Sequence, residues 1–211
     1  MKNPIYLILL LALGLVFVSY KWVSSGNDDK QVNDPEGNPV LENIMTRASV
    51  RSYSDRKIGK ETVDTLLRAA MAAPTAGNKQ PWRFVVIESR ATLDKIGNNF
   101  GSMTMAKEAP LAIVMCGDTS ETFEGEGREY WVQDVSAASE NLLLAAHSIG
   151  LGAVWCGIYP LSERVKVFSE MLELPENIIP MACICVGYPS GEVTPKDKWE
   201  PGHIHHEKWS E

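Results

Sequence analysis

The sequence predicts an α+β domain in which helices cover both faces of a sheet. Helix-like and strand-like patterns alternate from residue 41 onward, and no segment is repeated. Apolar residues make up 45% of the 211 residues, so the chain can bury a sizeable core. One helix-like segment, residues 128–148, is long and carries a continuous apolar stripe. Such a helix is expected to be buried or to lie at an interface.

Five segments have helical periodicity. They are residues 41–47, 60–73, 92–97, 128–148 and 162–172. In the second of them the apolar side chains gather on one face, and Pro74 follows as a stop signal. In the fourth, the apolar stripe includes Trp131 and Val135 and steps by four and three residues. Gly150 is placed to cap the C-terminus of this helix.

Four segments are predicted to be strands, namely residues 83–88, 111–116, 152–156 and 179–187. The four cysteines of the chain are Cys116, Cys156, Cys183 and Cys185. All of them fall in these strands among apolar neighbours, where side chains are expected to be buried. We therefore expect free buried thiols, although an exported chain could pair them as disulfides.

Residues 1–23 are predicted to be a signal peptide or a membrane anchor. Lys2 precedes a run of 14 residues, 5–18, without a charged side chain, which is shorter than the roughly 20 apolar residues of a usual spanning helix. A cleaved signal and a retained anchor stay open as alternatives. Residues 24–40 are polar and predict a linker, and residues 41–211 are the expected folded domain. The location expected from this organisation is an exported or membrane-anchored one, such as a bacterial periplasm.

Composition and missing motifs exclude several function classes. The formal net charge is −7, which disfavours nucleic acid as a partner. The sequence contains no phosphate-binding G-x-x-x-x-G-K-[ST] loop, no G-x-S-x-G elbow and no H-E-x-x-H helix. The histidines of residues 203–206 lack a nearby pattern of cysteine or carboxylate ligands, so no metal site is expected.

Two groups of polar residues point to a phosphate-bearing ligand with a flat ring. Arg47-Ala-Ser49-Val-Arg51 places two guanidinium groups and a hydroxyl within five residues, and Lys196 and Lys198 add two ammonium groups. Such cations could converge on one phosphate through charge-assisted hydrogen bonds, or they could simply be solvated surface charge. Residues 73–82 form a loop of small residues and side-chain amides. The backbone of such a loop can approach a flat ligand closely.

Taken in order, these segments resemble the FMN-dependent nitroreductase family. Residues 47–51 are similar to that family's opening R-x-S-x-[RK] motif, and residues 74–82 resemble its P-S-x-x-N-x-Q-P-W loop. Residues 150–157 resemble its G-L-G strand beside the flavin. Gly187-Tyr-Pro189, the basic pair of residues 195–198 and the aromatic residues 205–209 resemble its C-terminal segments. The resemblance extends over essentially all of residues 41–211.

The resemblance implies a three-layer α/β/α sandwich with a mostly antiparallel central sheet. It also implies a homodimer, formed through the long helix, in which the C-terminal arms are exchanged and two FMN sites lie at the interface. The residues implied to hold the phosphate are Arg47, Ser49, Arg51, Lys196 and Lys198. Those implied to line the ring from the partner chain are Pro74, Thr75, Ala76 and Asn78. Those implied to face its other side are Trp155, Cys156 and Gly157, where this sequence departs from members that carry a Glu-Gly pair.

The resemblance further implies an NAD(P)H oxidoreductase with a ping-pong reaction. NAD(P)H would deliver hydride to FMN, and a nitroaromatic, quinone or related acceptor would then take the electrons. The cofactor carries this chemistry, so no catalytic acid or base is expected. Phe123 is the expected substrate contact, because an aromatic ring there could cover the flavin. Two alternatives stay open: a membrane-tethered flavin module that does not use NAD(P)H, and a structural dimer without flavin.

Overall fold

The computed structural model describes residues 37–209, and from Asn43 onward these residues form one compact unit. The apolar run of residues 5–18 lies outside the described residues. Among the residues that are described, no helix is both long and apolar enough to cross a membrane.

Helices and strands alternate along the chain, as the sequence pattern predicts. The α-helices are α2 (Pro39–Thr46), α3 (Lys60–Met71), α4 (Arg90–Asn99), α5 (Tyr130–Ser148) and α6 (Ser162–Met171). The strands are β1 (Trp82–Ile87), β2 (Leu111–Asp118), β3 (Gly152–Gly157) and β4 (Ile178–Gly187). Short 3-10 turns were not predicted; the longest is η2 (Gly101–Lys107), and η4 (Gly125–Glu129) leads into α5.

The four strands form one antiparallel sheet in the order β1-β2-β4-β3. β2 and β4 lie in the centre, and β1 and β3 are the two edges. The outer edge of β3 is partly covered, because Ser49 forms an isolated bridge with Ala153. The sheet therefore has the antiparallel arrangement that the family resemblance implied.

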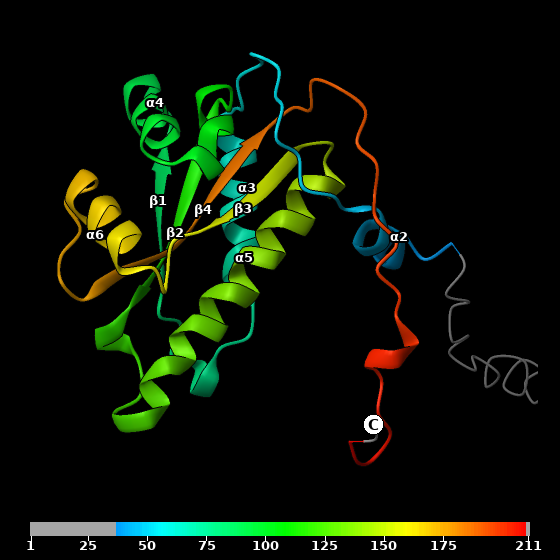
Figure 1. The fold of residues 1–211 in the computed structure, drawn as a ribbon, viewed down its shortest axis with the longest axis vertical. Coiled ribbons are helices and arrows are strands. Elements are labelled where there is room, and N and C mark those ends of the chain that lie inside the picture. Colours follow the sequence, from blue (N-terminus) through cyan, green and yellow to red (C-terminus); the bar gives the residue numbers. More distant parts are fainter. Residues whose placement is uncertain (1–36, 210–211) are drawn as a thin grey trace, which may run out of the picture. The chain divides into compact units, whose positions relative to one another are not determined.

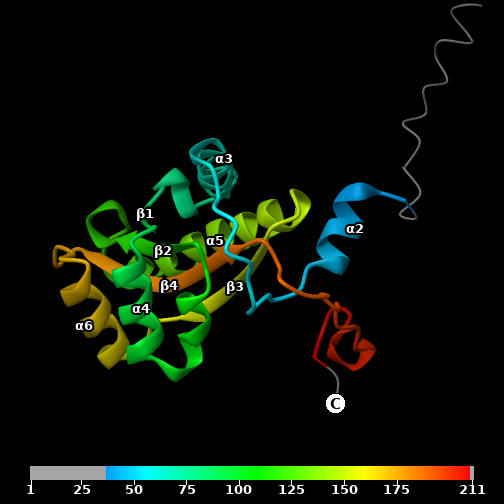
Figure 2. The same ribbon diagram turned by 90° about the horizontal axis from the view of Figure 1, so that it is seen from above.

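Helices cover both faces of the sheet and make three layers. α3 and α5 pack on one face, and α4 and α6 lie on the other (Figures 1 and 2). β2 illustrates why the sheet is buried on both sides: Ile113 and Met115 belong to the cluster under α5, whereas Val114 and Cys116 belong to the opposite cluster. Alternate side chains of one strand thus enter two cores.

The long helix α5 is held to the sheet by its predicted apolar stripe. Trp131 and Val135 are buried, and the indole of Trp131 lies where a Cβ at Gly117 would be, only 2.2 Å from it. A larger residue at that point of β2 would displace the helix. Gly150 follows α5 with a φ of 78° and donates its N–H to the carbonyl of His147, so the predicted glycine cap is confirmed.

The cysteines are free and buried, as expected from their positions in apolar strands. Burial raises the pKa of Cys116 to about 12, because a thiolate is poorly solvated in the core. These thiols are core side chains rather than nucleophiles.

Candidate functional site

The segment predicted to hold a phosphate runs beside the start of β3 and the end of β4. Val50 donates its N–H to the carbonyl of Ala153 at 3.0 Å, and Ser54 donates its N–H to the carbonyl of Tyr188 at 2.9 Å. These backbone bonds hold residues 49–54 in extended form along the sheet. The arginine-serine segment and the strand predicted to face a flavin are therefore neighbours.

A hollow of about 370 Å³ lies between this segment and the start of the C-terminal arm, and it is lined by residues 48–52 and 190–194. Ser190 donates its hydroxyl to the Ser52 hydroxyl oxygen at 2.7 Å and its N–H to the Ser52 carbonyl at 3.2 Å. Arg51 is exposed beside the hollow. Lys196 and Lys198 follow in the same arm and are also exposed; within the described residues neither forms an ion pair within 4 Å. The hollow thus places the arginine-serine segment against the start of the arm, whereas Lys196 and Lys198 lie farther along the arm and do not line it.

Among the residues that the structure describes, Arg47 is the one predicted phosphate ligand that pairs with a carboxylate. Its Nε lies 3.2 Å from Oε1 of Glu140 on α5. Glu140 is exposed, and such surface pairs contribute little to stability.

The loop predicted to line a ring is fixed by side-chain bonds. Ala76 donates its N–H to Oδ1 of Asp134 at 2.8 Å, and Asp134 is buried in α5. Gln80 donates its N–H to the Thr75 hydroxyl oxygen at 3.2 Å and its side-chain amide to Asn78 at 2.9 Å. The sequence did not indicate the role of Asp134, which is 58 residues away from the loop.

This loop also carries backbone strain. Asn78 and Gln80 have φ values of 56° and 52°, in the left-handed region that non-glycine residues rarely adopt. Strain of this kind costs roughly 1–3 kcal/mol per residue and gathers at ligand-binding loops. Gly77 has a φ of 55°, which a glycine adopts without strain. Pro74 and Asn78 are exposed, and Thr75 and Ala76 are half-buried.

The structure brings Phe123, the predicted substrate contact, onto the ring loop. A Cβ added to Gly77 would lie 2.6 Å from Cζ of Phe123, so the two residues are in direct contact. The Lys79 ammonium lies 5.2 Å from the centroid of the Phe123 ring, within the range of a cation–π interaction. Phe123 also lines a hollow of about 590 Å³ with Thr119 and other residues of the following turns.

Arg83 and Asp118 tie the ring loop to the segment that carries Phe123. Nη2 of Arg83 lies 2.9 Å from Oδ2 of Asp118, and its Nη1 donates to the carbonyl of Gln80 at 3.2 Å. The Asp118 carboxylate is buried and also accepts hydrogen bonds from Ser120 and Asn177. Burial alone would raise the pKa of Asp118, but these hydrogen bonds and the Arg83 charge outweigh it and lower the pKa.

The three residues predicted on β3 present different groups to their surroundings. Trp155 is half-buried against the core under α5. Cys156 is buried, with its sulfur 3.9 Å from that of Met105, and a hydrogen bond with Cys185 together with burial raises its pKa. Gly157 is exposed, and a Cβ there would meet no atom within 4 Å. The Cys156 side chain therefore belongs to the core, and Gly157 is the exposed residue of this segment.

Within one chain the two halves of the predicted site lie at opposite edges of the sheet. The loop of residues 74–80 leads into β1, whereas Ser49 and Gly157 lie at β3. Three strand spacings of about 4.8 Å separate these edges by roughly 14 Å. A flat ring that stacks between the two halves needs them closer together than this, so such a ring would take its loop from a second copy.

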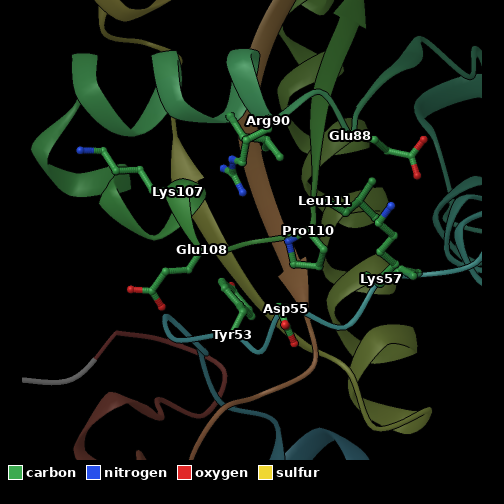
Figure 3. Close-up of a pocket in the computed structure, with 11 residues that line it drawn as sticks. Tyr53, Asp55, Lys57, Glu88, Arg90, Lys107, Glu108, Pro110 and Leu111 are labelled. Carbon is green, nitrogen blue, oxygen red and sulfur yellow. The ribbon is translucent and has the colours of Figure 1, made fainter.

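A further hollow, of about 730 Å³, contains none of the predicted site residues (Figure 3). Two of its charged residues hold parts of the fold together. Arg90 pairs with Asp94 at 2.9 Å and donates to the carbonyl of Ala109, which ties α4 to the segment before β2. Glu108 accepts a hydrogen bond from Ser52 at 3.2 Å. This hydrogen bond connects the segment of residues 49–54 to the residues before β2.

The whole domain matches known proteins. The model of the nitroreductase family matches residues 44–104 and 97–188. The chain belongs to the nitroreductase family. A relative in Methanothermobacter thermautotrophicus, named "Putative NADH dehydrogenase/NAD(P)H nitroreductase", is 46% identical over 171 residues, which are 81% of this chain and 87% of the relative.

Solved structures of the family have the same fold. A Parabacteroides distasonis protein with the same name is 45% identical and superposes with a TM-score of 0.78, over 82% of this chain and 99% of that one. An FMN-dependent nitroreductase from Clostridium difficile is 26% identical, with a TM-score of 0.72 over 79% and 98% of the two chains. The predicted family and the predicted fold are therefore confirmed.

Proposed function

We propose that the protein is an FMN-dependent NAD(P)H oxidoreductase that passes electrons to a nitroaromatic, a quinone or a related acceptor. The observation that carries this proposal is that two predicted FMN segments lie along β3, with the start of the arm that continues to Lys196 and Lys198 beside them. Residues 49–51 lie at the start of β3, the opening of the C-terminal arm lies beside them, and Gly157 lies at the end of β3. Relatives named FMN reductase and FMN-dependent nitroreductase support the same cofactor.

The residues present fit FMN at both of its ends. Arg51, Lys196 and Lys198 are exposed cations at or following the hollow between residues 48–52 and 190–194, as a phosphate dianion requires. Gly157 leaves space at an edge strand for a flat ring. Bound FMN supplies the two-electron chemistry, accepting hydride from NAD(P)H and passing electrons to the acceptor. The loop of residues 74–80 would close the other side of the ring from the partner chain, with Phe123 over the acceptor position.

A homodimer is part of the proposal, because the two halves of the site lie at opposite sheet edges in one chain. Exposed apolar side chains supply a surface for it: Met45, Trp199 and Trp209 are 76%, 73% and 81% exposed, which is costly for aromatic residues in a monomer. Sedimentation of the protein should give a dimer. The Trp199→Ala/Trp209→Ala variant should dissociate more readily, and a monomer that binds FMN fully would contradict a shared site.

The test of the proposed function is the visible spectrum of the purified protein before and after NADH or NADPH is added without oxygen. Flavin bands that bleach on addition would support the oxidoreductase. Bands that persist with both nucleotides but bleach with dithionite would favour the alternative of a flavin module that takes electrons from a membrane donor. A colourless protein that does not take up added FMN would overturn both.

The proposed location is an exported or membrane-anchored one, which rests on the sequence of residues 1–23 alone. Fractionation of cells that express the full chain tests it. Recovery with the membrane indicates a retained anchor, and a shortened chain outside the cytoplasm indicates a cleaved signal. A full-length chain in the cytoplasm would contradict this part of the proposal.

A further inference from the structure

Arg164 on α6 holds the end of β3 by two hydrogen bonds to neutral groups. Its Nη1 donates to the carbonyl of Gly157 at 2.7 Å, and its Nη2 donates to the Ser102 hydroxyl at 3.0 Å. The guanidinium carbon lies 5.8 Å from the centroid of the Phe100 ring. The side chain therefore joins α6, β3 and the turn after α4, and its orientation is fixed.

The charge of Arg164 is not neutralised by a nearby carboxylate. Within the described residues no aspartate or glutamate oxygen lies within 4 Å of its nitrogens, whereas Arg47, Arg83 and Arg90 each have such a partner. A cation that is held only by neutral acceptors is not cancelled by an opposite charge, so its electric field acts on other nearby groups. That field reaches the strand: the Arg51 and Arg164 charges both oppose the effects that raise the pKa of Cys156. The charges of Arg51 and Arg164 thus both act on the residue that precedes Gly157.

Flavin reduction creates a negative charge that such a cation can stabilise. A hydride from NADH brings two electrons and one proton to the ring, while NADH becomes NAD⁺. The reduced ring then carries one negative charge unless a second proton follows. A fixed positive charge near the place where that charge develops favours the reduced form without reorganisation.

We propose that Arg164 is a positioning residue for reduced FMN. It holds the end of β3 at Gly157, and its charge stabilises the anionic reduced ring. This proposal rests on the proposed function, because Gly157 is assigned to the ring through the family resemblance. It explains how a chain that lacks the Glu-Gly pair of other members can still favour the reduced cofactor. Arg164 is not one of the residues that the family motifs indicated.

Two substitutions separate the charge of Arg164 from its hydrogen bonds. Arg164→Lys keeps the charge, and Arg164→Gln keeps donor groups without the charge. Lys166 provides the matched control, because it is also a cation on α6 but lines a different hollow with Trp131 and Tyr159. Lys166→Gln removes one charge from the same helix.

The experiment compares the binding of oxidised and of dithionite-reduced FMN to each full-length variant, by titration and by the midpoint potential of the bound flavin. Arg164→Gln should bind oxidised FMN within about twofold of the wild type and reduced FMN about tenfold more weakly. Arg164→Lys should lose no more than about threefold, and Lys166→Gln should be unchanged. Equal losses in the Lys and Gln variants would assign Arg164 a structural role and overturn the proposal, as would an equal loss in Lys166→Gln.

Failure of the two proposals can be told apart. A wild-type protein that binds no FMN would overturn the proposed function, whereas normal FMN chemistry in an unchanged Arg164→Gln variant would overturn only the role of Arg164. Ser102→Ala is the second variant if Arg164→Gln does not fold, since it removes one anchor of the guanidinium and keeps the charge. It should weaken the preference for reduced FMN two- to threefold, and an unchanged preference would count against the proposal.

Discussion

The two ends of the proposed FMN site are built in different ways. At the ring end, the loop of residues 74–80 is held by side chains from separate elements, the Asp134 carboxylate and the Arg83 guanidinium among them. At the phosphate end, residues 49–54 are held by backbone bonds to β3 and β4. The cations Arg51, Lys196 and Lys198 there are exposed. Arg47 is the exception, because it is half-buried and pairs with Glu140.

The two ends therefore differ in how much of their structure is set before FMN binds. The ring loop is strained and internally bonded, so one chain already sets its shape, and changes there should affect stability as well as binding. Apart from Arg47, the cations of the phosphate end are exposed, and their strong interactions would form only with an anion. Changes at that end should affect binding and leave the free energy of unfolding nearly unchanged.

The largest effect is expected from removing two cations of the phosphate end. The Arg47→Ala/Arg51→Ala variant should bind FMN at least about 100-fold more weakly, because each lost charge-assisted hydrogen bond contributes roughly 1.5–3 kcal/mol. Fluorescence titration measures the affinity. Urea unfolding of the apoprotein should change by no more than about 0.5 kcal/mol. Arg68→Ala, an exposed arginine of α3, is the matched control, and full retention of FMN by the double variant would refute the phosphate assignment.

A pair of glycines tests the same contrast through stability. Gly77→Ala places a Cβ at a φ of 55° and only 2.6 Å from Phe123, so it should destabilise the protein by about 2 kcal/mol. Gly191→Ala, in the hollow at the phosphate end, meets no atom within 4 Å and should stay within about 0.5 kcal/mol. Urea unfolding of both variants decides the matter. Equal effects would show that the two ends do not differ in rigidity.

The hydrogen bond from Ala76 to Asp134 tests whether the ring loop is held by a side chain of α5. Asp134→Ala leaves the N–H of Ala76 without its acceptor, which should cost about 1–2 kcal/mol of stability and weaken FMN binding about tenfold. Asp134→Asn keeps an acceptor oxygen and should recover most of both losses. Affinity and unfolding midpoints measured on the two variants test this. If Asn behaves like Ala, the buried charge rather than the hydrogen bond holds the loop.

The sequence predicted the elements that depend on local pattern. The stripe of α5, its glycine cap and the apolar strands follow from residues a few positions apart, and the structure has all of them. The arginine-serine segment could also be found, because its residues are adjacent in the sequence and match a family motif. Features of this kind can be predicted without knowing the order of the strands in the sheet.

The contacts that hold the ring loop could not be predicted, because they depend on how distant segments pair. Asp134 and Ala76 are 58 residues apart, and Asp134 interrupts a helix stripe without any motif around it. Arg83 and Asp118 meet only because β1 and β2 pair with Trp82 opposite Gly117. The burial of Cys156 follows from its place in an apolar strand, as predicted, but its contact with the Met105 sulfur depends on how β3 packs against a segment about 50 residues away.

The smallest effect concerns Asp118, which links the ring loop to the segment that carries Phe123. The folded-state pKa of Asp118 is lowered below the ordinary value of 3.8. Ionised Asp118 therefore stabilises the fold at pH values above 3.8, and this contribution is lost as the pH falls through the lowered pKa. Acid unfolding followed by circular dichroism should therefore be shallower below about pH 4 in Asp118→Asn than in the wild type. At pH 7 the variant should be less stable, since Arg83 loses its charged partner. An unchanged acid profile would mean that the Asp118 carboxylate does not couple the two loops through its charge, and that the hydrogen bonds of Ser120 and Asn177 suffice.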